Sequence, residues 1–234
     1  MILTKLPNII NDLNTVLLPR VCFGCNARLY RGEQILCTPC RDQIPLTEYN
    51  FSEENSLDRT FYGRITIEKA SSFLFFNDIG VVKNLIHYLK YRNQPQIGTF
   101  LGDWYGSHLK KDKGLPTIDL VLPVPMHSKK LKKRGYNQVE GFGKRLAYHL
   151  DAAYCDDILI KTTHTQTQTQ KSRIFRWQHQ IPTFAIAKAD RLAHKKILLV
   201  DDVVTTGATL EACAKAINDE INVTIYIATM AMVP

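Results

Sequence analysis

The chain has 234 residues, of which 45% are hydrophobic and 22% are charged, and its formal net charge is +8. This length suits one α/β domain with a short appendage, and the apolar content is sufficient for a sizeable core. No window approaches the ~18 consecutive apolar residues of a membrane span, so we expect none, and the basic excess favours anionic partners such as phosphates, nucleic acid or acidic membrane surfaces.

An amphipathic helix is predicted at the start of the chain. Its apolar face consists of seven residues at helical spacing: Leu3, Leu6, Ile9, Ile10, Leu13, Val16 and Leu17. No small-residue cleavage site follows, which argues against a signal peptide. The polar face is rich in asparagine rather than lysine. We therefore expect this helix to dock on the body of the protein rather than on a membrane surface.

Four of the six cysteines form two tight pairs with the spacing C-x2-C-x11-C-x2-C: Cys22, Cys25, Cys37 and Cys40. Their clustering indicates a metal site rather than a disulfide framework, which suits a reducing cytoplasm. Four thiolates complete a tetrahedral structural zinc site, and the metal supplies the folding energy of so small a unit. A rubredoxin-type iron centre fits the same spacing, and two disulfides are a third alternative. Cys155 and Cys213 are predicted to be ordinary buried thiols.

Residues 46–60 are polar and acidic and are predicted to form a linker. After them, strand and helix patterns alternate, which predicts a mainly parallel sheet covered by helices on both faces. The expected strands are 64–76, 118–125, 157–160, 195–200 and 222–230, and the expected helices are 79–92, 98–111, 137–150 and 208–218. Three glycines in 98–111 form one stripe for close packing, and the polar run 162–170 is predicted to be a mobile loop.

The string ILLVDDVVTTGATL (197–210) carries the clearest chemistry. Asp201 and Asp202 end a buried strand, at the edge where open α/β sheets bind ligands. A glycine-containing turn at a helix N-terminus provides N–H donors and a positive dipole for a phosphate, and threonine hydroxyls add donors. The carboxylates suit vicinal ribose hydroxyls and, through them or through water, Mg²⁺.

Other interpretations of this string are weaker. It can be an acidic strand end followed by a threonine-rich helix cap. A receiver domain carries its paired acids after the first strand, whereas only 32 residues follow Asp202 here. A P-loop is excluded because no G-x4-G-K-[ST] occurs. The start of a dinucleotide-like pattern at Gly141-Phe142-Gly143 lacks its third glycine and is interpreted as helix packing.

A basic stretch follows the strand 118–125. It contains five cations in a short run: Lys129, Lys130, Lys132, Lys133 and Arg134. A solvated basic loop is the simplest interpretation. Because the stretch follows a parallel strand, however, it should emerge at the same sheet edge as Asp201.

The string 197–210 resembles the signature of type I phosphoribosyltransferases, and the order of all the motifs resembles the competence-protein ComF family, which includes GntX proteins. The resemblance implies a type I phosphoribosyltransferase-like fold that binds phosphoribosyl pyrophosphate. It implies that the acid pair holds the ribose hydroxyls. It further implies that the 5′-phosphate lies in a loop of five residues: Thr205, Thr206, Gly207, Ala208 and Thr209. Arg134 and Gly135 are implied to face the pyrophosphate.

The family's mobile-loop motif T-x2-Q-x7-R-x2-N-x4-F is also present. Four residues match it: Thr165, Gln168, Arg176 and Phe184. His179 occupies the asparagine position, which is a departure from the family. Arg176 is the candidate for a phosphate contact, and a catalytic role, when the loop closes over the substrate. A surface arginine in a flexible loop is the alternative.

We therefore expect an N-terminal helix, zinc module and linker at 1–60 and a phosphoribosyltransferase-like domain at 61–234 of a cytoplasmic protein. The resemblance implies binding of phosphoribosyl pyrophosphate with Mg²⁺ and a role in natural competence and DNA uptake through single-stranded DNA, with competence proteins as partners. Tyr136 and Trp177 are candidate platforms for bases. An active phosphoribosyltransferase with an unidentified small-molecule acceptor is the alternative, and a regulatory sensor is a third hypothesis.

Overall fold

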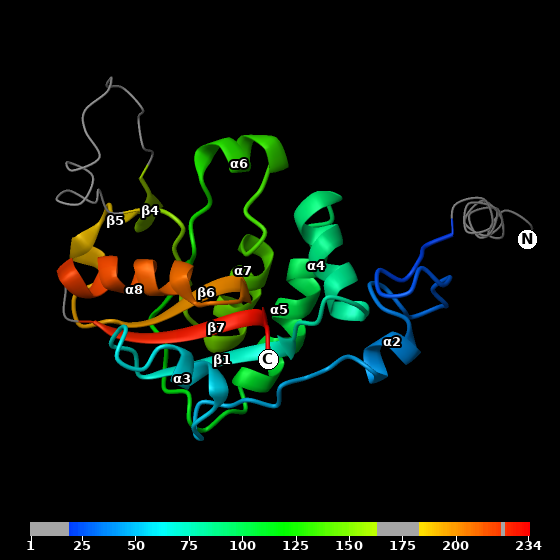
Figure 1. Cartoon of the computed structure of the whole chain (residues 1–234), viewed down its shortest axis with the longest axis horizontal. Helices are drawn as coiled ribbons and strands as arrows, with labels where there is room; N and C mark the ends of the chain where they lie inside the picture. The colour runs from blue at the N-terminus through cyan, green and yellow to red at the C-terminus, as the bar shows by residue number, and fades with distance from the viewer. Residues whose placement is uncertain (1–18, 163–182, 221–222) are drawn as a thin grey trace, which may run out of the picture.

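The computed structural model describes residues 19–162, 183–220 and 223–234. Its elements are named in chain order throughout (Figure 1). They are α2 (Thr38–Asp42), α3 (Ser56–Thr60), β1 (Lys69–Phe75), α4 (Val81–Tyr91), α5 (Gln96–Leu109), β2 (Leu120–Pro123), α6 (Ser128–Arg134), α7 (Glu140–Leu150), β3 (Ala153–Tyr154), β4 (Leu159–Lys161), β5 (Phe184–Ile186), a 3₁₀ turn (Ala189–Arg191), β6 (Lys196–Val204), α8 (Ala208–Glu220) and β7 (Thr224–Met232).

The main sheet has five strands in the order β1-β7-β6-β2-β3, and every neighbouring pair is parallel. Strands β4 and β5 form a separate antiparallel pair. Strand β6 lies at the centre of the main sheet and pairs with β2 on one side and β7 on the other. The predicted α/β class with a mainly parallel sheet is confirmed.

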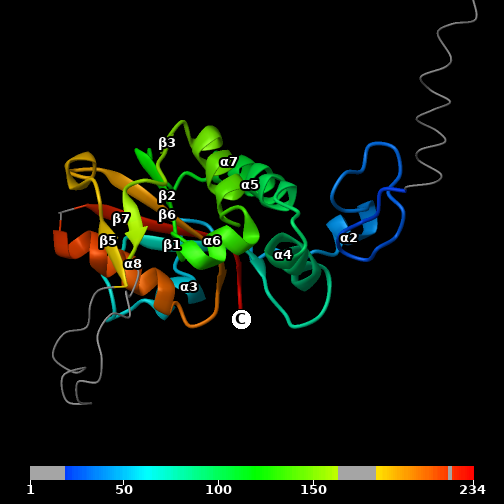
Figure 2. The ribbon, with the colours of Figure 1, turned by 90° about the horizontal axis from the view of Figure 1, so that it is seen from above.

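Helices cover both faces of the sheet, and alternate residues of β6 point into the two cores that result. Leu198 and Val200 pack in the core shared with α4, α5 and α7, whereas Ile197 and Leu199 pack in the core shared with α3 and α8. Figure 2 shows α5 and α7 on one side of the strands and α8 on the other. Helices α5 and α7 pack closely, since a Cβ at Gly102 would lie 2.7 Å from a backbone oxygen of α7. The predicted glycine stripe thus serves close packing.

The cysteine module, residues 20–45, packs against α4. Asn84 donates a hydrogen bond to the carbonyl of Gly24 over 2.7 Å, and the rings of Phe23 and Tyr88 meet edge to face with centroids 5.1 Å apart. Buried residues of the module join the core that lies under α4 and α5. The module is thus part of the body of the protein. The helix predicted over residues 3–17 lies outside the described residues.

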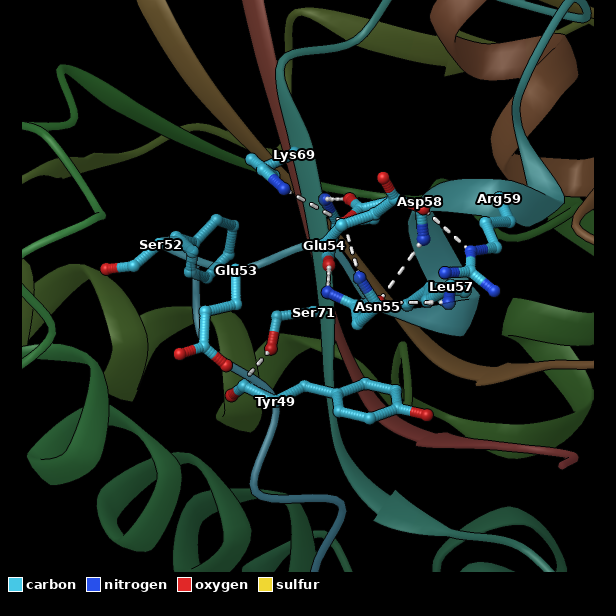
Figure 3. Close-up of polar contacts among 12 residues, drawn as sticks. Tyr49, Ser52, Glu53, Glu54, Asn55, Leu57, Asp58, Arg59, Lys69 and Ser71 are labelled. Carbon is cyan, nitrogen blue, oxygen red and sulfur yellow. Dashed lines mark hydrogen bonds and ion pairs between the residues drawn. The ribbon is translucent and has the colours of Figure 1, made fainter.

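The segment 46–60 is packed structure rather than a linker, and Figure 3 shows its contacts with β1. The Asn55 side chain caps α3 by accepting from the N–H groups of Leu57 and Asp58 at 2.9 and 3.2 Å, and it donates to the carbonyl of Ala70 at 2.8 Å. The buried Asp58 carboxylate accepts from the Ala70 N–H at 2.7 Å and from Lys69 at 3.2 Å. The linker interpretation is wrong because these polar residues form a capping box and bond to β1.

The basic stretch is a helix, α6, rather than the loop that the sequence predicts. His127 begins it, with a ring nitrogen accepting from the Lys129 N–H at 3.1 Å, and Gly135 ends it in the left-handed conformation at φ 84°. Lysine, leucine and arginine are good helix formers, so a capped run of them becomes helical. Within the described ranges, no helix is both long and apolar enough to cross a membrane.

Candidate functional site

The acid pair, Asp201 and Asp202, lies towards the carboxyl end of β6, where the parallel strands of the sheet end. The Asp202 carboxylate accepts three hydrogen bonds: from Lys90 at 2.8 Å, from the Gln138 amide at 2.7 Å and from the Val203 N–H at 2.5 Å. One oxygen of Asp201 accepts from the Asp202 N–H at 2.8 Å. Both carboxylates are thus buried on adjacent residues of β6, and that of Asp202 is in contact with a cation.

Burial raises the pKa of Asp201 to about 7, and the neighbouring charge of Asp202 adds to this effect. The positive charges of Lys90 and Lys161 act in the opposite direction. The site therefore favours a cation or a hydrogen-bond donor beside Asp201 when that carboxylate is ionised. Ribose hydroxyls and Mg²⁺ both meet this requirement.

The phosphate loop, residues 205–209, runs from the end of β6 into the first turn of α8 and lines a recess of about 40 Å³. Three of its side chains, Thr205, Thr206 and Thr209, are exposed. Gly207 has φ 74°, and a Cβ there would lie 2.8 Å from the ring of Phe61, so both conformation and packing require glycine. The recess has room for a single phosphate group but not for a nucleobase, and α8 begins directly beside it.

Arg64 braces the phosphate loop from the segment before β1. Its guanidinium donates to the carbonyl of Thr206 at 2.9 Å, to the carbonyl of Thr60 at 2.9 Å and to the carboxylate of Glu211 at 2.5 and 2.9 Å. Glu211 lies in the first turn of α8. The Arg64 side chain therefore connects the loop both to α8, which follows it, and to α3. The sequence carries no local signal for this role, because the partners in the loop and in α8, Thr206 and Glu211, are 142 and 147 residues away.

A cationic hollow of about 340 Å³ lies on the other side of the acid pair. Six residues line it: Lys90, Tyr91, Asn93, Lys130, Lys133 and Arg134. Arg134 donates to the Gln138 side chain, which in turn donates to Asp202. Arg134 and the acid pair, separate predictions from the sequence, are thus joined through one glutamine. Gly135 ends α6 beside them. Lys90 and Gln138 are site residues that sequence reasoning missed.

The four-cysteine cluster has the geometry of a metal site. The sulfur atoms of Cys22, Cys25, Cys37 and Cys40 all lie within 4.8 Å of one another. Zinc–sulfur bonds of about 2.3 Å place tetrahedral sulfurs about 3.8 Å apart, and the Cys25 and Cys37 sulfurs are 3.6 Å apart. The backbone N–H groups of Gly24 and Cys37 point to the Cys22 sulfur at 3.3 Å, which favours its thiolate form. The predicted ligands therefore fit one tetrahedral ion.

Most of the predicted mobile loop lies outside the described residues. This applies to Thr165, Gln168, Arg176, Trp177 and His179. Phe184, the last residue of the motif, is buried in β5, with the Lys161 ammonium 4.9 Å from its ring centre. Tyr136 is half-buried and its hydroxyl donates to the carbonyl of Leu89, so it packs against α4 rather than offering a free ring.

A parallel sheet with an acid pair and a phosphate loop at the end of its central strand places the protein in the phosphoribosyltransferase-like class. The phosphoribosyl transferase domain family matches residues 140–231. Competence protein F of Haemophilus influenzae is 27% identical over 203 residues, which cover 83% of this chain and 89% of that protein. DNA utilization protein YhgH of Salmonella typhi is 28% identical over 134 residues, 56% of this chain and 58% of that protein.

Among solved structures, glutamine phosphoribosylpyrophosphate amidotransferase from B. subtilis aligns with a TM-score of 0.44 and 14% identity, over 62% of this chain and 30% of that chain. The chain is thus a homologue of proteins named competence protein F and YhgH, and it contains a phosphoribosyl transferase domain. The resemblance to the ComF family that the motifs predict is confirmed.

Proposed function

We propose that this chain binds phosphoribosyl pyrophosphate with Mg²⁺ along the carboxyl edge of β6. The observation that carries the proposal is the position of the acid pair between a phosphate-sized recess and a cationic hollow. The ligand has three parts in the same order. Its 5′-phosphate fits the phosphate loop, its ribose hydroxyls fit the carboxylates of Asp201 and Asp202, and its pyrophosphate fits the side of Arg134 and Gly135.

The acid pair also suits the metal of this ligand. Mg²⁺ prefers oxygen ligands and retains several waters, so it needs few protein groups. When bound, it neutralises charge on the pyrophosphate. The residues of the chain hold the ribose by hydrogen bonds, and the loop N–H groups and exposed threonines hold the phosphate.

Zinc is the ion that we propose for the four cysteines.

Calorimetry with phosphoribosyl pyrophosphate and Mg²⁺ tests the proposal directly. The wild-type protein should bind, and the ligand should raise Tm. A double variant, Asp201→Asn with Asp202→Asn, should abolish both effects. The matched control is Asp190→Asn with Asp219→Asn, which removes two exposed acids. If the acid-pair variant and the control bind phosphoribosyl pyrophosphate equally well, the ribose does not bind at Asp201 and Asp202.

We further propose that the protein acts in DNA uptake by handling single-stranded DNA together with competence proteins. The names of the relatives, competence protein F and DNA utilization protein, support this role. The basic helix α6 supplies cations for a phosphate backbone, so affinity should fall steeply with salt. Replacing its four lysines by alanine should flatten the salt dependence of DNA affinity and leave zinc content unchanged. These lysines are Lys129, Lys130, Lys132 and Lys133. An unchanged salt slope would exclude α6 as the DNA contact.

An active phosphoribosyltransferase is the second candidate function, favoured by the domain match. The reaction would be displacement at C1 of phosphoribosyl pyrophosphate, with pyrophosphate leaving. The protein would contribute positioning and charge stabilisation, with Arg176 as the proposed contact on loop closure. Incubation with a metabolite mixture and an assay for pyrophosphate release separates this function from binding alone. Release that depends on the mixture and on Asp202 would establish catalysis.

A further inference from the structure

Helix α6 contributes no buried side chain to the protein. A helix of seven residues without an apolar face gains little from packing and is held by its ends. Its last turn carries three consecutive cations: Lys132, Lys133 and Arg134. In the described part of the chain, none of the four lysines of α6 lies within ion-pair distance of an acid. The helix therefore presents uncompensated positive charge, as a binding surface for a polyanion does.

The cations of α6 fall on two faces with different surroundings. Lys130, Lys133 and Arg134 have the spacing of one helix face and line the cationic hollow. Lys129 and Lys132 share the other face and are not part of its lining. In Figure 1, α6 and the end of α4 stand at the same end of the sheet. The Lys130–Lys133–Arg134 face of α6 thus meets the end of α4 across a concave surface.

Tyr91 is the aromatic residue of this hollow. It is the last residue of α4 and is 69% exposed, with the Arg134 guanidinium 5.9 Å from its ring centre and the His87 ring centre 5.3 Å away. An exposed ring flanked by cations is the arrangement on which single-stranded nucleic acids stack their bases. Tyr136, by contrast, uses its hydroxyl to bond the backbone of α4 and is packed.

We propose that single-stranded DNA binds across the cationic hollow in place of the pyrophosphate of the sugar phosphate, with one base stacked on Tyr91 and the adjoining phosphates on the Lys130–Lys133–Arg134 face of α6. The inference rests on the proposed DNA-handling function and assigns it a place. Single strands rather than duplex fit, because a platform ring requires an unstacked base. The opposite face of α6 adds only general electrostatic attraction.

Two matched pairs of variants test the placement through anisotropy of a labelled oligo-dT at low salt. The first pair consists of two double variants. One carries Lys130→Ala and Lys133→Ala, and the other carries Lys129→Ala and Lys132→Ala. Each double variant removes two exposed lysines from the same helix, so the general electrostatic loss is the same. The first should weaken binding about tenfold more than the second, because only its lysines touch bound phosphates. Equal losses of DNA affinity in the two double variants would overturn the assignment of the phosphates to the Lys130–Lys133–Arg134 face.

The second pair compares Tyr91→Ala with Tyr148→Ala. Tyr148 is 70% exposed on α7, and the Arg145 guanidinium lies 4.4 Å from its ring centre, but it is not part of the hollow. We expect Tyr91→Ala to weaken binding about 5- to 100-fold, Tyr91→Phe to restore it and Tyr148→Ala to have no effect. Equal affinities of Tyr91→Ala and Tyr148→Ala would overturn the platform. No binding by wild type would instead refute the DNA-handling function itself.

Discussion

The ammonium of Lys90 lies 2.8 Å from a carboxylate oxygen of Asp202, and both side chains are largely shielded from solvent. Lys90 belongs to α4, whose preceding turns contact the cysteine module through Asn84 and Tyr88. One helix therefore contacts both the cysteine module and the acid pair. Lys90 also lines the cationic hollow, so it can serve the ribose side or the pyrophosphate side of the site.

Replacing Lys90 by methionine should separate these two roles. A pyrophosphate group needs the cation, whereas ribose 5-phosphate has no group at that position. We expect Lys90→Met to weaken phosphoribosyl pyrophosphate about tenfold, in line with a charged hydrogen bond, and ribose 5-phosphate much less. Calorimetry with both ligands measures the difference. Lys83→Met, exposed on the same helix, is the control. Equal losses for the two ligands would place Lys90 at the ribose.

Removing the Arg64 brace should loosen the phosphate loop. Arg64→Ala deletes the bonds to Thr206, Thr60 and Glu211, so ribose 5-phosphate and phosphoribosyl pyrophosphate should both bind about tenfold more weakly. Arg64→Lys should retain part of the affinity, because an ammonium cannot reach all three partners in the fork geometry. The control is Arg59→Ala, an exposed arginine on α3. If Arg64→Ala binds both ligands as well as Arg59→Ala does, Arg64 does not support the phosphate loop.

The acid pair, the loop 205–209 and the four cysteines could be chosen as site candidates because each forms a motif of residues close in sequence. Lys90, Gln138 and Arg64 could not, since only the folded chain brings them to residues 64 to 147 positions away. The same limit applies to the fold. The alternating strands and helices were visible as periodic patterns, whereas α3 and α6 are short helices defined by capping groups rather than by an apolar face.

The cysteine cluster should hold about one zinc ion per chain. Cys37→Ser removes one of the four clustered thiols, so zinc content and the stability of the module should both fall. Elemental analysis and thermal unfolding measure the two effects. Cys213→Ser, a buried thiol far from the cluster in sequence, is the control for zinc content. Protein purified without chelator that contains neither zinc nor iron would contradict the site.

The pH dependence of stability should report the burial of Asp201. Its pKa is raised to about 7 in the folded protein from an ordinary value near 3.8. The stability that protonation provides is therefore complete below about pH 3.8 and is lost as pH rises through about 7. Between pH 5 and pH 8 without ligand, the Tm of wild type should fall relative to that of Asp201→Asn, by at least about 3 °C.

Comparison of the two proteins at each pH isolates this carboxyl, because any loss of metal in acid affects both alike. Asp190→Asn, which removes an exposed acid, should follow wild type across the same range. Phosphoribosyl pyrophosphate with Mg²⁺ should reduce the difference at pH 8, since hydroxyls and a cation then stabilise the ionised carboxylate. Parallel Tm curves for wild type and Asp201→Asn would show that Asp201 ionises as easily in the folded chain as in the unfolded one, and that its burial has no electrostatic cost.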